Sequence, residues 1–252
     1  MSKESSSRQP MSRLRKTYIS RLVGRCFVFI ACILLYFAKP SEFDLLNGMR
    51  FFERFSIPHI LWVIWVIDMI YQLVPVKNHV PLGSQKLFRQ HFKPIRRKIN
   101  YASLKNYIVS TTKAAYKVFF LWVALIALIG VLYYNAVIDR TILFLISVFF
   151  YVCDLICVLI WCPFRLIMKN RCCTTCRIFN WDHLMMFSPL IFAGGFYAVS
   201  LVVMSVVVWL VWEGCIVLFP ERFWEFSNSA LKCSNCTDKL CTQYCQKLRP
   251  SQ

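Results

Sequence analysis

Five long runs of apolar residues dominate the chain, and short polar segments separate them. The runs cover residues 22–38, 58–76, 118–138, 141–161 and 188–212. A helix needs about 20 apolar residues to cross a bilayer core that is roughly 30 Å thick. Because the runs lack the two-residue alternation of barrel strands, each one predicts a membrane-spanning helix. The predicted fold class is all-α, a transmembrane helical bundle with five spans.

The composition also favours a location in a membrane. Hydrophobic residues make up 58% of the 252 residues, and the mean hydropathy is +0.53. A soluble domain of this length has no interior large enough for so many apolar side chains. Large aromatic residues before Ala38 make a poor cleavage site, so we interpret the first run as a retained anchor. The chain divides into a basic N-terminus (1–21), a membrane domain (22–212) and a cysteine-rich tail (213–252).

The positions of Lys and Arg predict how the bundle is oriented. Residues 1–25 carry seven of them, residues 77–117 carry ten and residues 162–187 carry four, together 21 of the 30 in the chain. If each run crosses the bilayer once, these three segments lie on one face. Short loops rich in Lys and Arg stay in the cytoplasm, so the N-terminus is predicted to be cytoplasmic. The same reasoning predicts that the tail from Glu213 onward lies outside.

The loop between the second and third runs contains an amphipathic pattern. Phe88, Phe92, Ile95 and Ile99 are spaced as on one face of a helix, which Pro94 is expected to kink or split. The basic residues around this face are Lys86, Arg89, Lys93, Arg96, Arg97 and Lys98. A basic amphipathic loop helix on the cytoplasmic side favours binding to anionic lipid headgroups. The alternative is that these charges only set the topology. Nucleic acid is not indicated, because no nucleic-acid-binding motif accompanies them.

Two acidic residues fall inside the predicted spans. Asp68 lies in the second run and Asp154 in the fourth. A carboxylate at membrane depth is costly, so it is expected to face a partner, a cavity or water. One hypothesis is a proton or substrate pathway in a small transporter or channel component. The alternative is a structural role, in which each Asp hydrogen-bonds a neighbouring helix or pairs with Arg25.

The chain contains 13 cysteines, and one group of them follows the fourth run. Cys173 and Cys176 form a C-x-x-C pair, which lets two sulfur atoms converge from a tight turn. Cys172 or the upstream Cys162, together with His183, could complete a Cys₃His set, which suits zinc. Arg177, like the preceding arginine at 171, is expected to favour thiolates. The alternative is an ordinary reduced turn.

A second group of cysteines lies in the tail. Its members are Cys233, Cys236, Cys241 and Cys245, with the spacing C-x₂-C-x₄-C-x₃-C. Four thiols within a short polar segment are typical of a metal site, with zinc favoured over an iron–sulfur cluster because the spacing matches no established cluster motif. Two disulfides are the alternative, and they suit the predicted location outside the cell.

Part of the C-terminal third resembles an uncharacterised family of bacterial multi-pass membrane proteins. The resemblance lies in residues 170–183 (NRCCTTCRIFNWDH), 185–189 (MMFSP) and 220–223 (PERF), followed by the tail cysteines. It implies a bacterial plasma or inner membrane and supplies no activity.

Three functional hypotheses follow from the sequence. The first is a membrane protein with cysteine-based metal-binding or redox centres at the membrane surface. The second is the transporter or channel component built around the two intramembrane carboxylates. The third is a structural or assembly factor with a disulfide-bonded tail. The sequence contains no nucleophile elbow, P-loop, dinucleotide fingerprint or H-E-x-x-H motif, so it predicts no catalytic residue.

Overall fold

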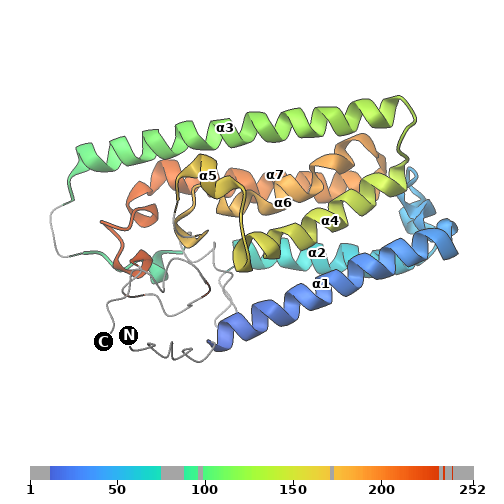
Figure 1. The fold of residues 1–252 in the computed structure, drawn as a ribbon, viewed down its shortest axis with the longest axis horizontal. Helices are drawn as coiled ribbons and strands as arrows, with labels where there is room; N and C mark the ends of the chain where they lie inside the picture. Colours follow the sequence, from blue (N-terminus) through green and yellow to red (C-terminus); the bar gives the residue numbers. More distant parts are fainter. Residues whose placement is uncertain are drawn as a thin grey trace, which may run out of the picture.

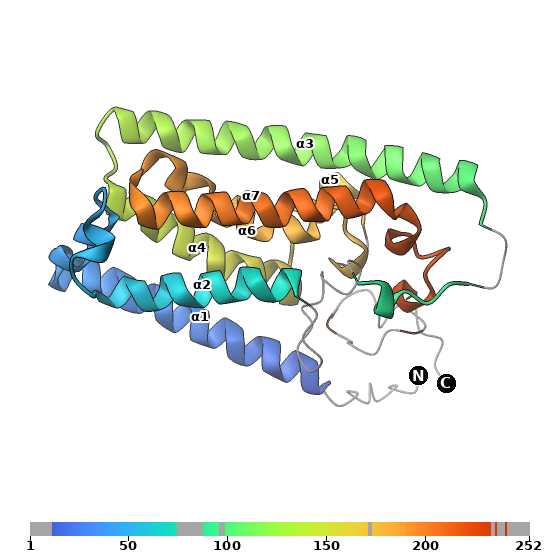
Figure 2. The same ribbon diagram turned by 180° about the vertical axis from the view of Figure 1, so that it is seen from behind.

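The structure is a computed structural model that describes residues 12–74, 88–95, 99–170, 173–232, 235 and 240. These residues fold into an elongated bundle of α-helices without β-strands, so the all-α fold class is confirmed (Figures 1 and 2). The helices are α1 (Arg13–Ala38), α2 (Ile57–Leu73), α3 (Tyr101–Tyr134), α4 (Arg140–Leu159), α5 (Phe164–Met168), α6 (Asp182–Phe187) and α7 (Gly195–Leu218). Short 3-10 turns lie in the segments between them.

Four helices in the described part of the chain are long and apolar enough to cross a membrane: α1, α3, α4 and α7. The second expected span, 58–76, forms the shorter helix α2 of 17 residues. At 1.5 Å per residue, α2 is about 26 Å long. It ends at Leu73 because the next residue, Val74, precedes a proline, whose ring disfavours helical backbone in the residue before it. The expected count of five spans is therefore corrected to four, with α2 as a shorter apolar helix beside them.

Polar residues ahead of the apolar runs set where the helices begin. The side chain of Ser12 accepts a hydrogen bond from the amide of Arg15 at the start of α1. Asn100 and Asp139 cap α3 and α4 in the same way. These side chains satisfy amides that have no partner within the first helical turn. As a result, α1 and α3 both begin in polar sequence before their apolar runs.

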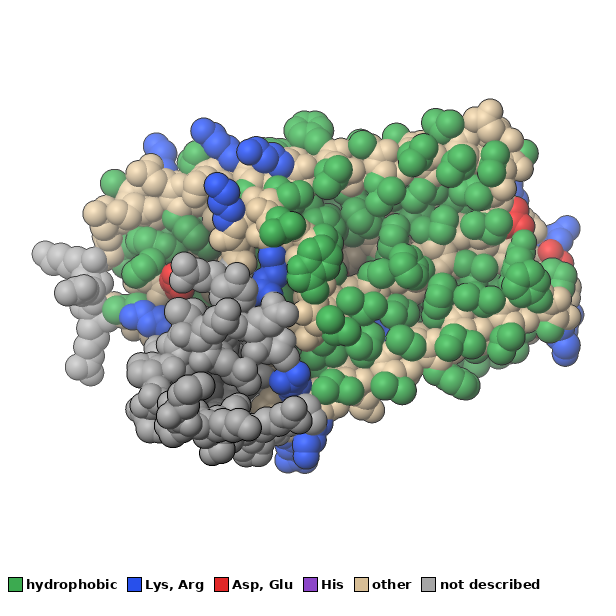
Figure 3. Space-filling model, viewed as in Figure 1, with side chains coloured by type: hydrophobic (Ala, Val, Ile, Leu, Met, Phe, Trp, Pro, Cys, Tyr) green, Lys and Arg blue, Asp and Glu red, His purple; other side chains and the backbone are tan. Residues whose placement is uncertain are grey.

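Helix α1 lies at the edge of the bundle and packs mainly on α4. None of its residues is buried. Its exposed apolar side chains recur along one face: Val23, Phe27, Ile30, Leu34 and Phe37. Hydrophobic side chains also cover the middle of the molecule, and charged side chains gather toward its two ends (Figure 3). This distribution fits a bundle that is surrounded by lipid.

The fifth apolar run does not form one helix. Residues 182–192 form a buried arm, made of α6 and the 3-10 helix Ser188–Phe192, that runs along the bundle (Figure 1). The chain then reverses at Gly194 and Gly195, which have positive φ angles, and enters α7. The predicted span 188–212 is therefore wrong in its boundaries, because its first residues belong to the arm and α7 continues to Leu218.

The reversal depends on a glycine. At Gly195 φ is +75°, and a Cβ atom would lie 2.6 Å from the carbonyl oxygen of Leu46. Any larger residue would therefore clash with backbone as well as strain its own conformation. The amide of Phe196 donates to the carbonyl of Gly48 at 2.9 Å, which fixes the start of α7 against the connection between α1 and α2.

Protein surrounds the arm on several sides. The side chains of Phe187, Leu190 and Ala193 are at most 3% exposed, and the arm packs against α3, α4 and α7. The indole of Trp122 in α3 donates to Oγ of Ser188 at 2.9 Å. At membrane depth no water is present to hydrogen-bond the backbone groups that lie outside an α-helix. Such backbone is therefore tolerated there when protein encloses it. The enclosure by three helices meets this requirement.

The arm decides which end of the bundle the tail reaches. It begins beside Gln72 of α2 and finishes beside Tyr134, the last residue of α3, so it adds one more passage along the bundle. Helix α7 consequently returns to the end where α1 begins, which we call the N-terminal end (Figure 2). There the amide of Ser229 donates to the carbonyl of Lys93 at 2.8 Å. Segments that hydrogen-bond each other lie on the same side of a membrane, so the predicted separation of the tail from the basic loop is wrong.

The amphipathic helix expected over 88–99 is not formed in residues 88–95. This segment contains only the short 3-10 turn Arg89–His91. Pro94, which has no amide hydrogen to donate within a helix, instead forms a bridge with Asn228 of the tail. The tail holds the segment extended, and the local spacing of apolar residues cannot reveal a contact so distant in sequence.

This topology predicts the outcome of reporter fusions. A reporter fused after Lys232 is expected to lie on the same side of the membrane as one fused ahead of Arg13, and a reporter inserted at Ala136 on the other side. Paired reporters that are active only in the cytoplasm or only outside it would measure this. A Lys232 fusion that reports the side opposite to Arg13 would contradict the passage of the arm.

Candidate functional site: a polar layer inside the bundle

Charged side chains from α1 and α4 meet inside the bundle. Nη1 of Arg25 donates to Oδ2 of Asp154 at 2.7 Å and to the backbone oxygen of Tyr151 at 2.7 Å. The guanidinium also lies over the ring of Tyr151, 3.7 Å from its centre. The side chains of Arg25 and Asp154 are 16% and 27% exposed. The pairing with Arg25 that the sequence allowed for Asp154 is therefore present, and it attaches the edge helix α1 to the bundle.

A second polar group joins α2 to the buried arm. Nε2 of Gln72 lies 3.1 Å from Oδ2 of Asp182 and 3.0 Å from Nδ1 of His183. Nδ1 of His183 is also 3.3 Å from Oδ1 of Asp182. Since Nε2 of Gln72 can only donate, a neutral His183 accepts at Nδ1 and carries its proton on Nε2, an assignment made from the hydrogen-bond network. Gln72 and His183 are both buried.

Asp68 lies one helical turn before Gln72 on α2 and belongs to the same region. Its carboxylate interacts electrostatically with Arg25, Tyr151 and His183. Asp154 likewise interacts with His183. The two groups are therefore electrostatically connected. We call the connected set the polar layer; it consists of Arg25, Asp68, Gln72, Asp154, Asp182 and His183.

The polar layer lies nearer to the N-terminal end of the bundle than to the other. Eleven to fourteen residues separate Arg25, Asp68 and Asp154 from the ends of their helices at the opposite end. At 1.5 Å per residue this is about 17–21 Å. At the N-terminal end, α2 and α4 continue for only five residues beyond Asp68 and Asp154. The carboxylates thus lie at a similar depth on helices that run in the same direction.

Tightly packed aromatic side chains separate the polar layer from the opposite end. Trp65, Phe144, Phe187 and Tyr197 are fully buried. The ring of Trp65 contacts those of Phe187 and Phe144, with centroids 5.0 and 5.9 Å apart, and Phe144 contacts Tyr197 at 5.9 Å. This apolar core leaves the N-terminal end as the shorter route to the polar layer.

The polar layer has more acceptors than donors. Oε1 of Gln72 and Oδ1 of Asp182 are buried and have no hydrogen-bond donor among the described residues. The contact of 3.3 Å between His183 and Oδ1 of Asp182 is close, but it is not a hydrogen bond in this geometry. A buried acceptor without a donor costs about 1–3 kcal/mol. With His183 neutral, Arg25 is the one cation of this set against three carboxylates, so the layer can take up a positive charge.

The loop cysteines and His183 do not converge. Sγ of Cys173 donates to the backbone oxygen of Cys157 at 3.9 Å. Cys176 packs in an apolar cluster and, with Phe223, lines a cavity of about 10 Å³. Within the described residues, no three His, Cys, Asp or Glu side chains are placed to hold a metal ion. His183 instead belongs to the polar layer.

Arg177 pairs with an acid rather than with the cysteines. Its two terminal nitrogens donate to both carboxylate oxygens of Glu213 at 2.6 and 2.5 Å. The indole of Trp181 donates to the same carboxylate at 2.8 Å. This bidentate pair holds the loop after α5 against the last turns of α7. Arg177 was expected to stabilise thiolates at the neighbouring C-x-x-C pair, but it pairs with Glu213 instead.

Several predicted site residues lie outside the described residues. They are Lys86, Arg96, Arg97 and Lys98 of the basic loop, and Cys172, Cys233, Cys236, Cys241 and Cys245 of the cysteine groups. The lipid-binding and metal-binding predictions for them stay predictions. Arg89 and Lys93, the described members of the basic set, have exposed side chains at the N-terminal end.

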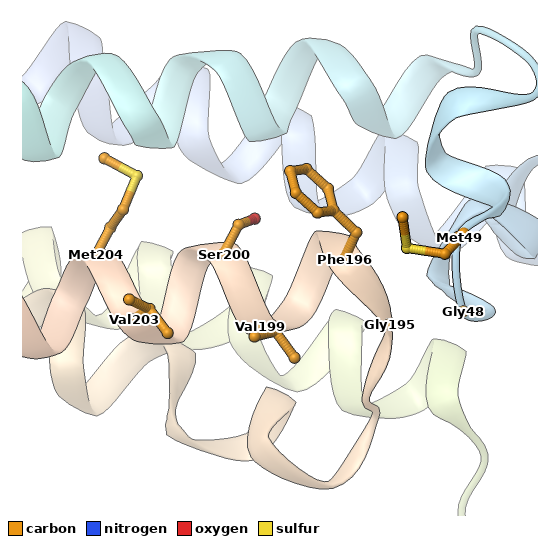
Figure 4. Close-up of a pocket in the computed structure, with 8 residues that line it drawn as sticks. All are labelled: Gly48, Met49, Gly195, Phe196, Val199, Ser200, Val203 and Met204. Atoms are coloured by element: carbon orange, nitrogen blue, oxygen red, sulfur yellow. The ribbon is translucent and has the colours of Figure 1, made fainter.

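A groove of about 610 Å³ lies away from the polar layer, between α7 and the turn that contains Gly48 and Met49 (Figure 4). Phe196, Ser200 and Met204 point toward α2 in this view. The lining is apolar and open, which fits contact with lipid chains rather than a polar ligand.

Sequence reasoning missed two members of the polar layer. Gln72 is four residues after Asp68, so the two share a face of α2, and this spacing could have been noticed. Asp182 stands in a polar segment, where a charge is unremarkable until the structure shows that the arm carries it into the bundle.

The chain matches no protein-family model, no curated protein and no solved structure. The resemblance of its C-terminal third to a bacterial membrane protein family stays a prediction, and the roles of the residues above rest on their geometry.

The ion pair between Arg25 and Asp154 predicts a specific pattern of stability. Removing one partner leaves the other charge largely buried and without its counter-ion, so Arg25→Leu and Asp154→Leu are each expected to lower the free energy of unfolding by about 3 kcal/mol. The double variant is expected to lose much less than the sum. Unfolding in detergent measures all three, with Arg21→Leu, one turn earlier on α1, as the control. Additive losses would contradict the pairing.

Proposed function

We propose that the protein is an integral membrane protein that moves protons across the bilayer, with the polar layer as its proton-binding site. The observation that carries the proposal is the excess of carboxylates around Arg25, with buried acceptors that lack donors. Ionisable groups inside a membrane bundle are costly, and they commonly mark ion or proton pathways. A net negative layer at low dielectric gains free energy when it takes up a proton.

His183 is the group best placed to receive that proton. A proton on its Nδ1 could be donated to Oδ1 of Asp182, the acceptor 3.3 Å away that lacks a donor, once the amide nitrogen of Gln72 turns away from the ring. The carboxylates of Asp68 and Asp154 would also stabilise the imidazolium. Imidazole changes its charge near neutral pH, so His183 can bind and release a proton under cellular conditions.

The distribution of charge favours a cytoplasmic location for the N-terminal end. The segments joining the helices at the opposite end, with the first residue of α4, carry four basic and four acidic residues: Lys39, Arg50, Arg54, Arg140, Glu42, Asp44, Glu53 and Asp139. The other 26 of the chain's 30 Lys and Arg lie elsewhere in the sequence. By the positive-inside rule, the N-terminal end faces the cytoplasm of a bacterial plasma or inner membrane. The exposed Arg89 and Lys93 would then meet anionic lipid headgroups, together with the basic residues around them.

Proton flux into liposomes tests this function. Purified protein is reconstituted around a pH-sensitive dye, and a membrane potential is imposed. We expect dye-reported acidification with the wild type, and its loss with Asp154→Asn or His183→Gln, because each removes a titrating group of the layer. Asp139→Asn, which alters a helix cap at the opposite end, is the matched control and is expected to keep the flux. A wild type no faster than empty liposomes, or full flux in both layer variants, would contradict the proposal.

A second candidate function is zinc binding by the cysteine groups. Leu240 of the tail is buried against Leu159 of α4, with Phe179 packed beside them, so the tail approaches the loop that carries Cys173 and Cys176. Because Leu240 directly precedes a tail cysteine in the sequence, we propose that the two cysteine groups share one thiolate site. On the cytoplasmic side, thiolates stay reduced and available for metal, whereas the disulfide alternative for the tail requires an oxidising side.

Metal analysis of protein purified without chelators tests this second function. We expect bound zinc in the wild type and at least a two-fold loss in the Cys173→Ser, Cys176→Ser double variant. The control is Cys26→Ser, which removes a thiol of α1. Protein that holds iron instead of zinc would favour an iron–sulfur cluster. Metal-free protein with disulfide-bonded tail cysteines would support the structural hypothesis instead.

A further inference from the structure

The short helix α5 lies against α3 at the N-terminal end of the bundle. Phe164 and Met168 of α5 pack in one apolar cluster with Ala115 and Val118 of α3. The ring of Phe164 also contacts the ring of Trp122, with the centroids 6.3 Å apart. Since Val118 begins the apolar run of α3, these contacts place α5 at the level where that helix enters the apolar part of the bundle. This level is the membrane boundary of the N-terminal end.

Basic side chains from both helices gather at this boundary. Lys113 and Lys117 lie just before the apolar run of α3, Lys169 follows the last residue of α5, and all three are exposed. Neither helix contains an acidic residue. Within the part of the chain that the structure describes, none of these lysines forms an ion pair. Lys and Arg side chains are seen together over α5 and the neighbouring part of α3 (Figure 3), so this surface is complementary to an anion.

The same surface carries exposed apolar side chains. Leu166 of α5 is 74% exposed, and Trp161, just ahead of this helix, is 53% exposed. Tyr116 and Phe120 of α3 are exposed as well. At a bilayer surface, such side chains reach the acyl chains while neighbouring lysines extend to the headgroups. An acidic partner in water would contact the lysines and leave the apolar side chains unused. The combination therefore favours a phospholipid of the leaflet at this end.

The backbone of Lys169 is a second, independent observation. Its φ angle is +49°, in the left-handed region. Glycine is the residue most often found in this conformation at the end of a helix, because a Cβ atom makes the conformation unfavourable. Strained residues of this kind cluster at functional sites. A lysine here costs stability that a glycine would not, and a role for its ammonium group accounts for that cost.

We propose that Lys113, Lys117 and Lys169 bind the headgroup of an anionic phospholipid, with Trp161 and Leu166 in contact with its acyl chains. The phosphate accepts hydrogen bonds from the ammonium groups, and each lysine near an anionic membrane surface strengthens binding about five-fold. The site is separate from the basic loop that follows α2, and it uses no residue of the polar layer. It requires neither proton movement nor a metal, so it stands or falls independently of both candidate functions.

Native mass spectrometry of the full-length protein in detergent tests the proposal. The protein is mixed with equal amounts of phosphatidylglycerol and phosphatidylcholine, and the lipid that stays bound is measured. We expect the wild type to retain phosphatidylglycerol over phosphatidylcholine by about five-fold or more. The triple variant Lys113→Gln, Lys117→Gln, Lys169→Gln is expected to retain roughly ten-fold less phosphatidylglycerol. The corresponding triple Lys→Arg variant should retain it as the wild type does, because the charges are kept.

Two matched controls locate the site. The triple variant Lys39→Gln, Arg50→Gln, Arg54→Gln removes three charges at the opposite end and should retain phosphatidylglycerol as the wild type does. Lys105→Gln should do the same, since Lys105 is exposed on α3 but lies 12 residues, about 18 Å, before Lys117. A loss in either control as large as in the lysine variant would overturn the location, and equal retention of both lipids by the wild type would overturn the proposal. Glycerol phosphate that binds as tightly as phosphatidylglycerol would overturn the choice of a lipid.

The single variant Lys169→Gly separates lipid binding from folding. Glycine adopts the left-handed conformation without strain, so this variant is expected to unfold in detergent at the same temperature as the wild type or at a higher one. It is nevertheless expected to retain several-fold less phosphatidylglycerol, because one of the three ammonium groups is missing. A Lys169→Gly protein that is at least as stable as the wild type and retains as much phosphatidylglycerol would contradict the role of Lys169.

Discussion

A segment of chain that is not α-helical can lie inside a membrane bundle only if protein surrounds it, and this constraint shapes the structure. Within the arm, α6 is α-helical and residues 188–192 form a 3-10 helix, so the second half of the arm places backbone that is not α-helical inside the molecule. Helices α3, α4 and α7 pack around it closely enough that a Cβ atom at Gly130 would lie 2.5 Å from the ring of Phe192. The reversal at Gly195 then sends α7 back beside the arm. The position of the tail at the N-terminal end follows from that reversal.

The arm also explains why a polar layer can exist at this depth. Each buried ion costs several kcal/mol to remove from water, and a partner must offset that cost. Arg25 offsets it for Asp154, and the arm brings Asp182 and His183 to Gln72. The balance is incomplete because one arginine faces three carboxylates. Helix α1 has no fully buried residue, and it is attached to the bundle both by partly buried apolar side chains such as Phe29 and Leu35 and by the ion pair. A change in the charge of the layer should therefore affect how tightly α1 is held.

The features that could be predicted from the sequence are those that depend on a local pattern of residues. Asp68 and Asp154 stood out because a charge inside an apolar run is visible without a structure. Helices α1 and α4 follow from uninterrupted apolar sequence with a capping residue ahead of it. The sequence did not reveal the reversal because residues 188–212 are apolar throughout, and a high hydropathy does not show where the chain changes direction. Pro189 and the pair Gly194-Gly195 were the available signals, since a proline and two consecutive glycines are unusual in one span.

Contacts between distant segments account for the other errors. The loop 88–95 has helical spacing, but its pairing with the tail, 132 residues or more away in sequence, outweighs that local preference. His183 was assigned to the cysteines because it follows them closely, whereas the arm carries it to α2. Correcting the topology strengthens the charge argument that had produced the wrong placement of the tail. Among the described residues, four basic residues lie in the segments at the opposite end, and four acids balance them.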